Sequence, residues 1–93
     1  MIVFTLLTLS AQHARTATHL VLTERLATDV FLDEAIGTQP LYRVLFLTKA
    51  LLYRRIELLL QARFPDNDFR IYATPVTHVN DAEADRVRQL QVV

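Results

Sequence analysis

The hydrophobic residues of this chain follow one order twice, a strand pattern, then a helical pattern, then a second strand pattern. Strands are expected over residues 2–9, 29–36, 42–48 and 69–76, and helices over about 11–28, 50–63 and 81–90. This βαββαβ order with a short C-terminal helix predicts an α+β, ferredoxin-like sandwich, with an antiparallel sheet and the main helices on one face. Because crossover connections are right-handed, few other topologies remain.

Capping and turn residues mark where these elements begin and end. Ser10 is expected to cap the first helix, since its hydroxyl can accept a hydrogen bond from a free amide of the first turn. Residues 37–40, Gly-Thr-Gln-Pro, are the clearest turn signal, and residues 65–68 are expected to end the second helix. Asn80 or Asp81 is expected to cap the terminal helix.

The expected helices present their larger apolar residues at core spacing. The first helix offers Ala14, Ala17, Val21, Leu22 and Leu26, and the second offers Leu52, Ile56, Leu59, Leu60 and Phe64. In the third strand, Val44, Phe46 and Thr48 face one way and Arg43, Leu45 and Leu47 the other.

Hydrophobic residues make up 52% of a chain of 93 residues, which we expect to form a single domain, residues 1–93. So small a domain has one small core, and the excess must be buried elsewhere. The strand over residues 2–9 has no polar face, and the strand over 42–48 is apolar on both faces. Leu58 also lies on the far side of the second helix from Ile56. We therefore predict that the protein assembles with copies of itself.

Composition also excludes several classes of function. The chain has no cysteine, which rules out a disulfide framework, a thiolate zinc site and a cysteine nucleophile. Ten basic and ten acidic residues cancel, so we expect neither nucleic acid nor membrane as a partner. The apolar N-terminus lacks the basic region of a signal peptide, and a cytoplasmic location is expected.

Histidines are the first candidates for a metal site. His13 and His19 are six residues apart, which places them on different sides of a helix, and His78 lies in a separate segment. The spacing therefore favours surface histidines. A bound divalent metal ion, the one cofactor considered, would require His13, His19 or Asp29 together with groups from another copy.

Cations of the third strand are the candidates for binding a small ligand. Arg43 and Lys49 stand at its two ends, beside Tyr42, and would suit an anion at a cleft between subunits. The alternative is that the long cationic side chains extend into water. Asp33 and Glu34 point to opposite faces of a strand, which favours an exposed strand end over paired carboxylates.

Catalysis finds little support in the sequence. No glycine-rich phosphate-binding motif is present, and no base can be assigned by spacing to the hydroxyls of Thr5, Thr8 or Ser10. An RNA-recognition domain has the same element order, but its third strand is rich in aromatic residues, and here that strand's interior supplies only Phe46. We therefore expect a protein that is not an enzyme.

Four stretches resemble the CutA family of divalent-cation tolerance proteins: residues 24–30 (Glu-Arg-Leu-Ala-Thr-Asp-Val), 41–43 (Leu-Tyr-Arg), 44–49 (Val-Leu-Phe-Leu-Thr-Lys) and 71–76 (Ile-Tyr-Ala-Thr-Pro-Val). With the matching element order, the resemblance covers nearly the whole chain. It implies a PII-like homotrimer of ferredoxin-like protomers with the sheets facing inward. The function it implies is a binding or scaffold protein linked to divalent metal tolerance.

The chain departs from the family pattern where metal ligands are concerned. Asp29 replaces a family cysteine, and Phe64-Pro65-Asp66 replaces a His-Pro-Tyr. Cysteine and histidine are the soft ligands that copper prefers. The hairpin around residues 37–40, which in the family helps to join subunits, is also shortened. A sensor of the PII or ACT kind, binding a small molecule at subunit clefts, is the alternative function.

Overall fold

The computed structural model describes residues 1–65 and 69–90. Its elements are β1 (Ile2–Thr8), α1 (Ala11–Thr23), β2 (Phe31–Ala35), β3 (Leu41–Thr48), a short 3₁₀ helix η1 (Ala50–Leu52), α2 (Tyr53–Arg63), β4 (Phe69–Pro75) and α3 (Asp81–Arg88). The βαββαβ order with a terminal helix is therefore confirmed. The turn expected at residues 65–68 falls mostly on residues 66–68, which lie outside the described part.

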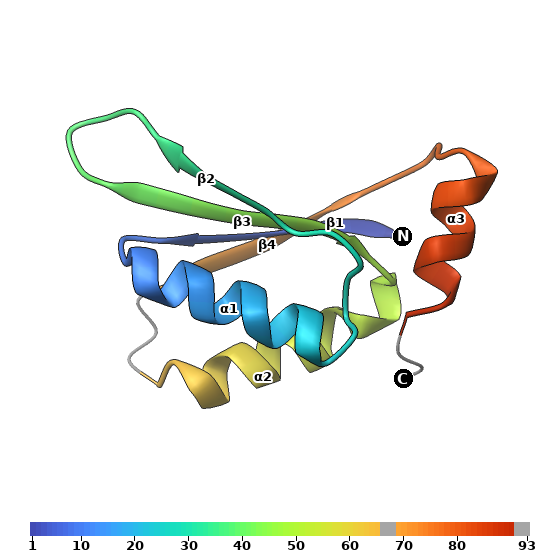
Figure 1. Ribbon diagram of the computed structural model, residues 1–93, viewed down its shortest axis with the longest axis horizontal. Coiled ribbons are helices and arrows are strands. Elements are labelled where there is room, and N and C mark those ends of the chain that lie inside the picture. The colour runs from blue at the N-terminus through green and yellow to red at the C-terminus, as the bar shows by residue number, and fades with distance from the viewer. Residues whose placement is uncertain (66–68, 91–93) are drawn as a thin grey trace.

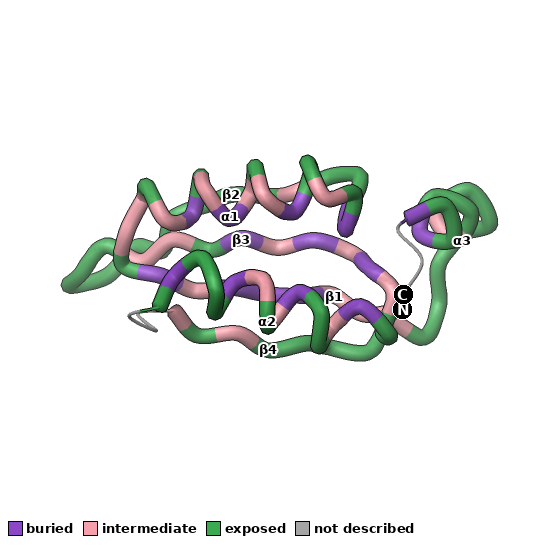
Figure 2. Tube along the Cα trace, turned by 90° about the horizontal axis from the view of Figure 1, so that it is seen from below, coloured by how far each residue is buried: buried purple, intermediate pink, exposed green. Residues whose placement is uncertain are grey.

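The strands form an antiparallel sheet in the order β2-β3-β1-β4. Both α1 and α2 lie against one face of this sheet, and α3 stands at one end of it (Figure 1). The first and last strands in this order are largely exposed, and burial concentrates in β1, β3 and the inner sides of α1 and α2 (Figure 2). The opposite sheet face is not covered by α1 or α2.

Contacts between aromatic rings show which residues of β1 and β3 face the helices. Phe4 of β1 stacks on Phe46 of β3, with ring centroids 5.1 Å apart, and lies 5.3 Å from the ring of Tyr53 in α2. Val44, Phe46 and Thr48 are all buried, which confirms that they share one face of β3 and shows that this face is the one turned toward the helices. The buried apolar core consists of Phe4, Leu6, Ala14, Ala17, Val21, Leu26, Ala27, Val44, Phe46, Leu52, Ile56, Leu60, Phe64, Val87 and Leu90.

The first helix ends at Thr23, so the expectation that it continues to Thr28 is wrong. Arg25 adopts a left-handed backbone with φ of 57°. The amide of Arg25 donates to the Leu22 carbonyl at 3.1 Å, and the amide of Leu26 donates to the Val21 carbonyl at 2.9 Å. These paired bonds are those of a Schellman C-cap, in which Leu26 returns to pack on Val21.

Because α1 ends at Thr23, the set of core residues expected from this helix also changes. Leu26 is buried, but it follows α1 instead of belonging to it, and Leu22 is 40% exposed. Ala14, Ala17 and Val21 form the buried face of α1 as expected. In the second helix, Leu52 is buried within η1, so the α-helix itself starts three residues after the predicted position 50.

The predicted N-caps are confirmed. The Ser10 hydroxyl accepts from the amide of His13 at 3.1 Å, and the Asn80 side chain accepts from the amide of Glu83 at 2.8 Å. Lys49 ties α3 to the end of β3, because its ammonium donates to the carbonyl of Leu90 at 3.1 Å. The position of α3 at the sheet end is therefore held by packing of its apolar residues and by this hydrogen bond.

Candidate functional site

The sheet face that points away from α1 and α2, called here the open face, carries side chains in rows across the strands. In the central row, Phe31 pairs with Leu45, Leu45 with Thr5, and Thr5 with Tyr72. In a second row, Leu47 pairs with Val3 and Val3 with Thr74. Residues at alternate positions of a strand share a face, so these rows lie side by side.

Large apolar side chains dominate these rows. Phe31 is 66% exposed and Tyr72 is 48% exposed, whereas Val3, Leu45 and Leu47 are half-buried. The face opposite the helices of a lone antiparallel sheet is usually polar. Part of the apolar excess that the sequence indicated therefore lies on the open face, whereas Leu58 is exposed on α2. The open-face patch, as the term is used below, consists of Val3, Leu7, Phe31, Leu45, Leu47 and Tyr72.

A charged row adjoins the patch toward the β2–β3 hairpin. Arg43 donates to both carboxylate oxygens of Asp33, from Nε at 3.0 Å and from Nη2 at 2.6 Å. The hydrogen bond from Arg43 holds the pKa of Asp33 below its ordinary value. Arg70 belongs to the same row, beyond Leu7. The open face thus changes from ionic to apolar along its length.

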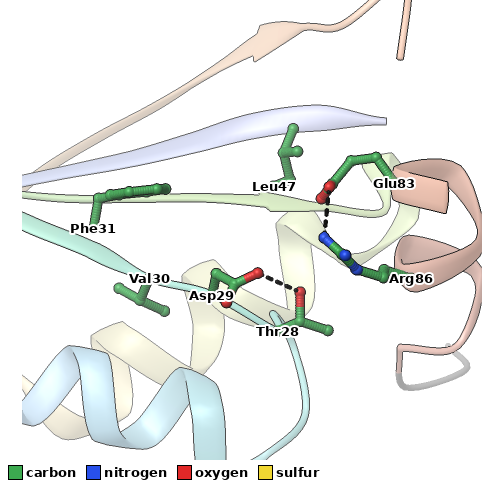
Figure 3. A pocket seen from close by; sticks show the side chains of 7 residues that line it. All are labelled: Thr28, Asp29, Val30, Phe31, Leu47, Glu83 and Arg86. Carbon is green, nitrogen blue, oxygen red and sulfur yellow. Dashed lines mark hydrogen bonds and ion pairs between the residues drawn. The ribbon is translucent and has the colours of Figure 1, made fainter. Parts of the chain in front are cut away.

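At the far end of the patch, a cavity of about 500 Å³ lies between α3 and the beginning of β2. Phe31, Leu47 and Val30 supply its apolar lining, with Phe31 and Leu47 also belonging to the open-face patch. The polar lining comes from Thr28 and Asp29 on the β2 side and from Glu83 and Arg86 of α3. Figure 3 shows Thr28 and Asp29 together before β2, and Glu83 and Arg86 together on α3.

Each polar wall of the cavity has an internal hydrogen bond. The hydroxyl of Thr28 donates to a carboxylate oxygen of Asp29 at 3.3 Å, and Arg86 donates to Glu83 at 3.1 Å (Figure 3). The Glu83 side chain is 26% exposed and that of Arg86 57% exposed. The cavity thus combines a few polar side chains with an apolar surface, called here the apolar floor, formed by Val30, Phe31 and Leu47. Such a combination is typical of small-molecule sites.

The candidate metal ligands do not meet in one copy. The His13 ring packs on Phe64, with centroids 4.8 Å apart. His19 is exposed near the middle of α1, and Asp29 lies beyond that helix. Among residues 1–65 and 69–90, no three His, Cys, Asp or Glu side chains cluster as metal ligands. Within the described residues, His13, His19 and Asp29 therefore do not form a three-ligand metal site in one copy.

The candidate ligand-binding residues are likewise separated. Tyr42 pairs with Thr8 on the helix-facing side of the sheet, whereas Arg43 lies on the open face with Asp33. Lys49, at the other end of β3, bonds to Leu90. A single small ligand cannot touch both ends of an eight-residue strand, which spans roughly 25 Å. Binding by Tyr42, Arg43 or Lys49 stays a prediction.

The sequence alone does not predict most of the residues that line this cavity. Asp29 is a candidate only as a metal ligand, and Thr28, Glu83 and Arg86 are not among the candidate site residues. The cavity joins residues 28–31 to residues 83–86, and no spacing rule links segments so far apart in the chain. The apolar pattern of β3 was the one signal pointing here, since it gave the strand apolar residues on both faces, with Leu47 on the face opposite Phe46.

No helix in the described part of the chain is long and apolar enough to cross a membrane. No protein-family model matches the chain, and no curated protein matches its sequence.

Solved structures match almost the entire chain. CutA1 from Pyrococcus horikoshii has a TM-score of 0.82 at 16% identity, with 96% of each chain covered. The divalent cation tolerance protein CutA1 from Thermus thermophilus has a TM-score of 0.80 at 20% identity, covering 99% of this chain and 100% of its own. The periplasmic divalent cation tolerance protein CutA from Archaeoglobus fulgidus has a TM-score of 0.78 at 14% identity, covering 96% of this chain and 97% of its own. These likenesses confirm the fold that the sequence resemblance predicted.

Proposed function

From a fold shared with the CutA1 divalent cation tolerance proteins, we propose that this chain is a homotrimeric binding or scaffold protein that contributes to divalent metal tolerance. The observation that carries the proposal is the open-face patch. Further copies of the chain are the occupants whose chemistry suits it, because the patch is apolar at its centre and a closed ring of copies buries the same residues on every copy. The number three comes from the resemblance of the sequence to the family.

Apolar area at the patch provides the driving force. Phe31 and Tyr72 retain about half or more of their surface in the single chain. Removing apolar surface from water contributes about 25 cal/mol per Å². Burial of these rings and the neighbouring Leu45 between copies would therefore favour association, and the Arg43–Asp33 pair at the margin can remain in water.

The oligomeric state tests this proposal directly. Light scattering on the wild type at micromolar concentration should give three times the 10.7 kDa mass of one chain. Leu45→Glu should shift the protein to a monomer, because it places a carboxylate at the centre of the patch. Circular dichroism establishes that the variant is folded.

Leu58→Glu is the matched control. Leu58 is 49% exposed but lies on α2, away from the open face, so this substitution adds the same charge outside the proposed interface. Its mass should equal that of the wild type. A monomeric wild type, or a trimer lost in Leu58→Glu and kept in Leu45→Glu, would refute assembly through the open face.

Because the described residues contain no cluster of three metal-ligating side chains, we propose that a role in metal tolerance is indirect or uses a site shared between copies. His13, His19 and Asp29 remain the residues proposed to contribute to a shared site. A cytoplasmic location, lack of enzymatic activity and lack of nucleic-acid binding are proposed with this function, although the relative from Archaeoglobus fulgidus is described as periplasmic.

A small-molecule sensor is the second candidate, and the cavity beside α3 favours it. Its volume of about 500 Å³ lies within the usual range of ligand pockets, roughly 300–1,000 Å³. Because Phe31 and Leu47 line the cavity and also belong to the open-face patch, a ligand there would touch residues of the proposed interface. Binding would then be coupled to assembly.

A further inference from the structure

The lining of the cavity beside α3 has more negative than positive charge. Asp29 and Glu83 supply carboxylates, and Arg86 supplies a guanidinium that is already bonded to Glu83. The Asp29 carboxylate accepts one hydrogen bond, from Thr28. An ionised carboxylate has about four acceptor positions, so Asp29 retains the capacity to bind a cationic donor.

The apolar floor determines what kind of cation fits. Phe31 is 66% exposed, and Leu47 lies on the neighbouring strand β3 (Figure 3). An aromatic face attracts a cation and also packs against an apolar body. A ligand with an ammonium group and an apolar portion would satisfy Asp29 and Phe31 together.

Other ligand classes suit this lining less well. An anion would meet two carboxylates, and the one guanidinium is engaged by Glu83. A hard divalent metal ion takes six or more oxygen ligands and would gain nothing from Phe31 and Leu47. Because the lining has more carboxylates than cations and also an apolar surface, an organic cation suits it better than an anion or a metal ion.

We propose that the cavity between α3 and the start of β2 binds a small organic cation, with its ammonium on Asp29 and its apolar body on Phe31 and Leu47. This inference deepens the sensor candidate and rests on it for the consequence of binding. The ligand uses Phe31 and Leu47, which also belong to the proposed interface, so the amine and a neighbouring copy compete for these side chains.

Titration with phenethylamine, followed by calorimetry and by nuclear magnetic resonance, tests the proposal. The amine should bind more tightly than uncharged phenylethanol, and phenylpropionate should bind most weakly. Asp29→Asn should weaken amine binding about fivefold, the size expected for an exposed ion pair. Arg86→Gln should instead tighten it, because it leaves the Glu83 carboxylate without its neutralising partner.

Asp81→Asn is the matched control, since it removes the same charge from an exposed position on α3 that does not line the cavity. It should leave amine affinity unchanged. Equal losses in Asp81→Asn and Asp29→Asn, equal binding of phenylpropionate and phenethylamine, or no response of Phe31 and Leu47 signals to millimolar amine would overturn the proposal.

Light scattering on the same samples separates this inference from the proposed function. Amine binding that leaves the mass of the assembly unchanged supports the cavity as a binding site. It counts against a sensor, because a sensor of this kind couples binding to assembly. Amine binding by a monomeric wild type supports the cavity and refutes the trimer. A trimer that binds no amine keeps the scaffold function and refutes the cavity ligand.

Discussion

Arg43 and Asp33 form a two-point contact on an exposed sheet face, and its effect depends on pH. The hydrogen bond from Arg43 favours the ionised carboxylate, which lowers the pKa of Asp33 in the folded state. A lowered folded-state pKa gives a stabilising contribution that is complete above the ordinary pKa of about 3.9. That contribution is lost as the pH falls through the lower, folded-state value.

We expect the Asp33 carboxyl signal to titrate below its ordinary range and to move upward in Arg43→Gln. Nuclear magnetic resonance over the acid range measures this midpoint in both proteins. Arg70→Gln removes a cation from the same row, beyond Leu7, and should leave the Asp33 midpoint nearly unchanged. An Asp33 midpoint that does not respond to Arg43→Gln would contradict the assigned cause.

Among the elements, α1 is followed by a turn that contains a residue whose backbone suits glycine. Arg25 has φ of 57°, a left-handed conformation that costs roughly 1–2 kcal/mol for a residue with a Cβ atom. The ending is nevertheless required, because it returns Leu26 to the core beside Val21. Leu26 in turn supplies the carbonyl that accepts from the buried Thr48 hydroxyl at 2.7 Å.

Arg25→Gly should therefore stabilise the protein by about 0.5–1 kcal/mol, after allowance for the greater freedom of glycine in the unfolded chain. Urea unfolding at one fixed protein concentration measures the gain. Arg25→Ala removes the same side-chain charge but keeps the Cβ atom, so it should give little or no increase. Similar gains in both variants would attribute the effect to charge instead of backbone conformation.

For the whole molecule, the trimer proposal connects stability to concentration. A folded state that exists as an oligomer is stabilised by mass action, so its melting temperature rises with protein concentration. We expect the wild type to show this rise in scanning calorimetry and Leu45→Glu to show none. A wild-type melting temperature that stays constant over a wide concentration range would argue that the open face does not associate.

The helices and strands, and the division of strand residues between two faces, could be predicted from the sequence. Both depend on residues that are close together in the chain. Ser10 and Asn80 were recognised as caps because a cap needs only the amides of the next turn. Alternation in β3 separated Phe46 from Leu47 because the side-chain period of a strand is two. The end of α1 was placed too late because Arg25 is not a residue that usually marks a left-handed C-cap.

The surroundings of the candidate site residues could not be predicted as well from the sequence, because they depend on how the helices pack on the sheet. Tyr42 and Arg43 are neighbours in the chain, yet a strand sends them to opposite faces, and the sequence alone did not show which face would be covered. His13 was considered as a ligand, but its ring packs on Phe64 from the end of α2. Contacts of this kind arise from how helices lie on the sheet.

The repeated strand–helix–strand order was determined by the sequence itself, because local periodicity fixes each element and right-handed connections leave few ways to join them. The open face and its apolar excess followed from the same patterns. Only the tertiary structure decided where α3 lies, and with it the cavity that joins Asp29 and Phe31 to Glu83 and Arg86. That placement depends on packing between segments more than fifty residues apart, which no local pattern of residues encodes.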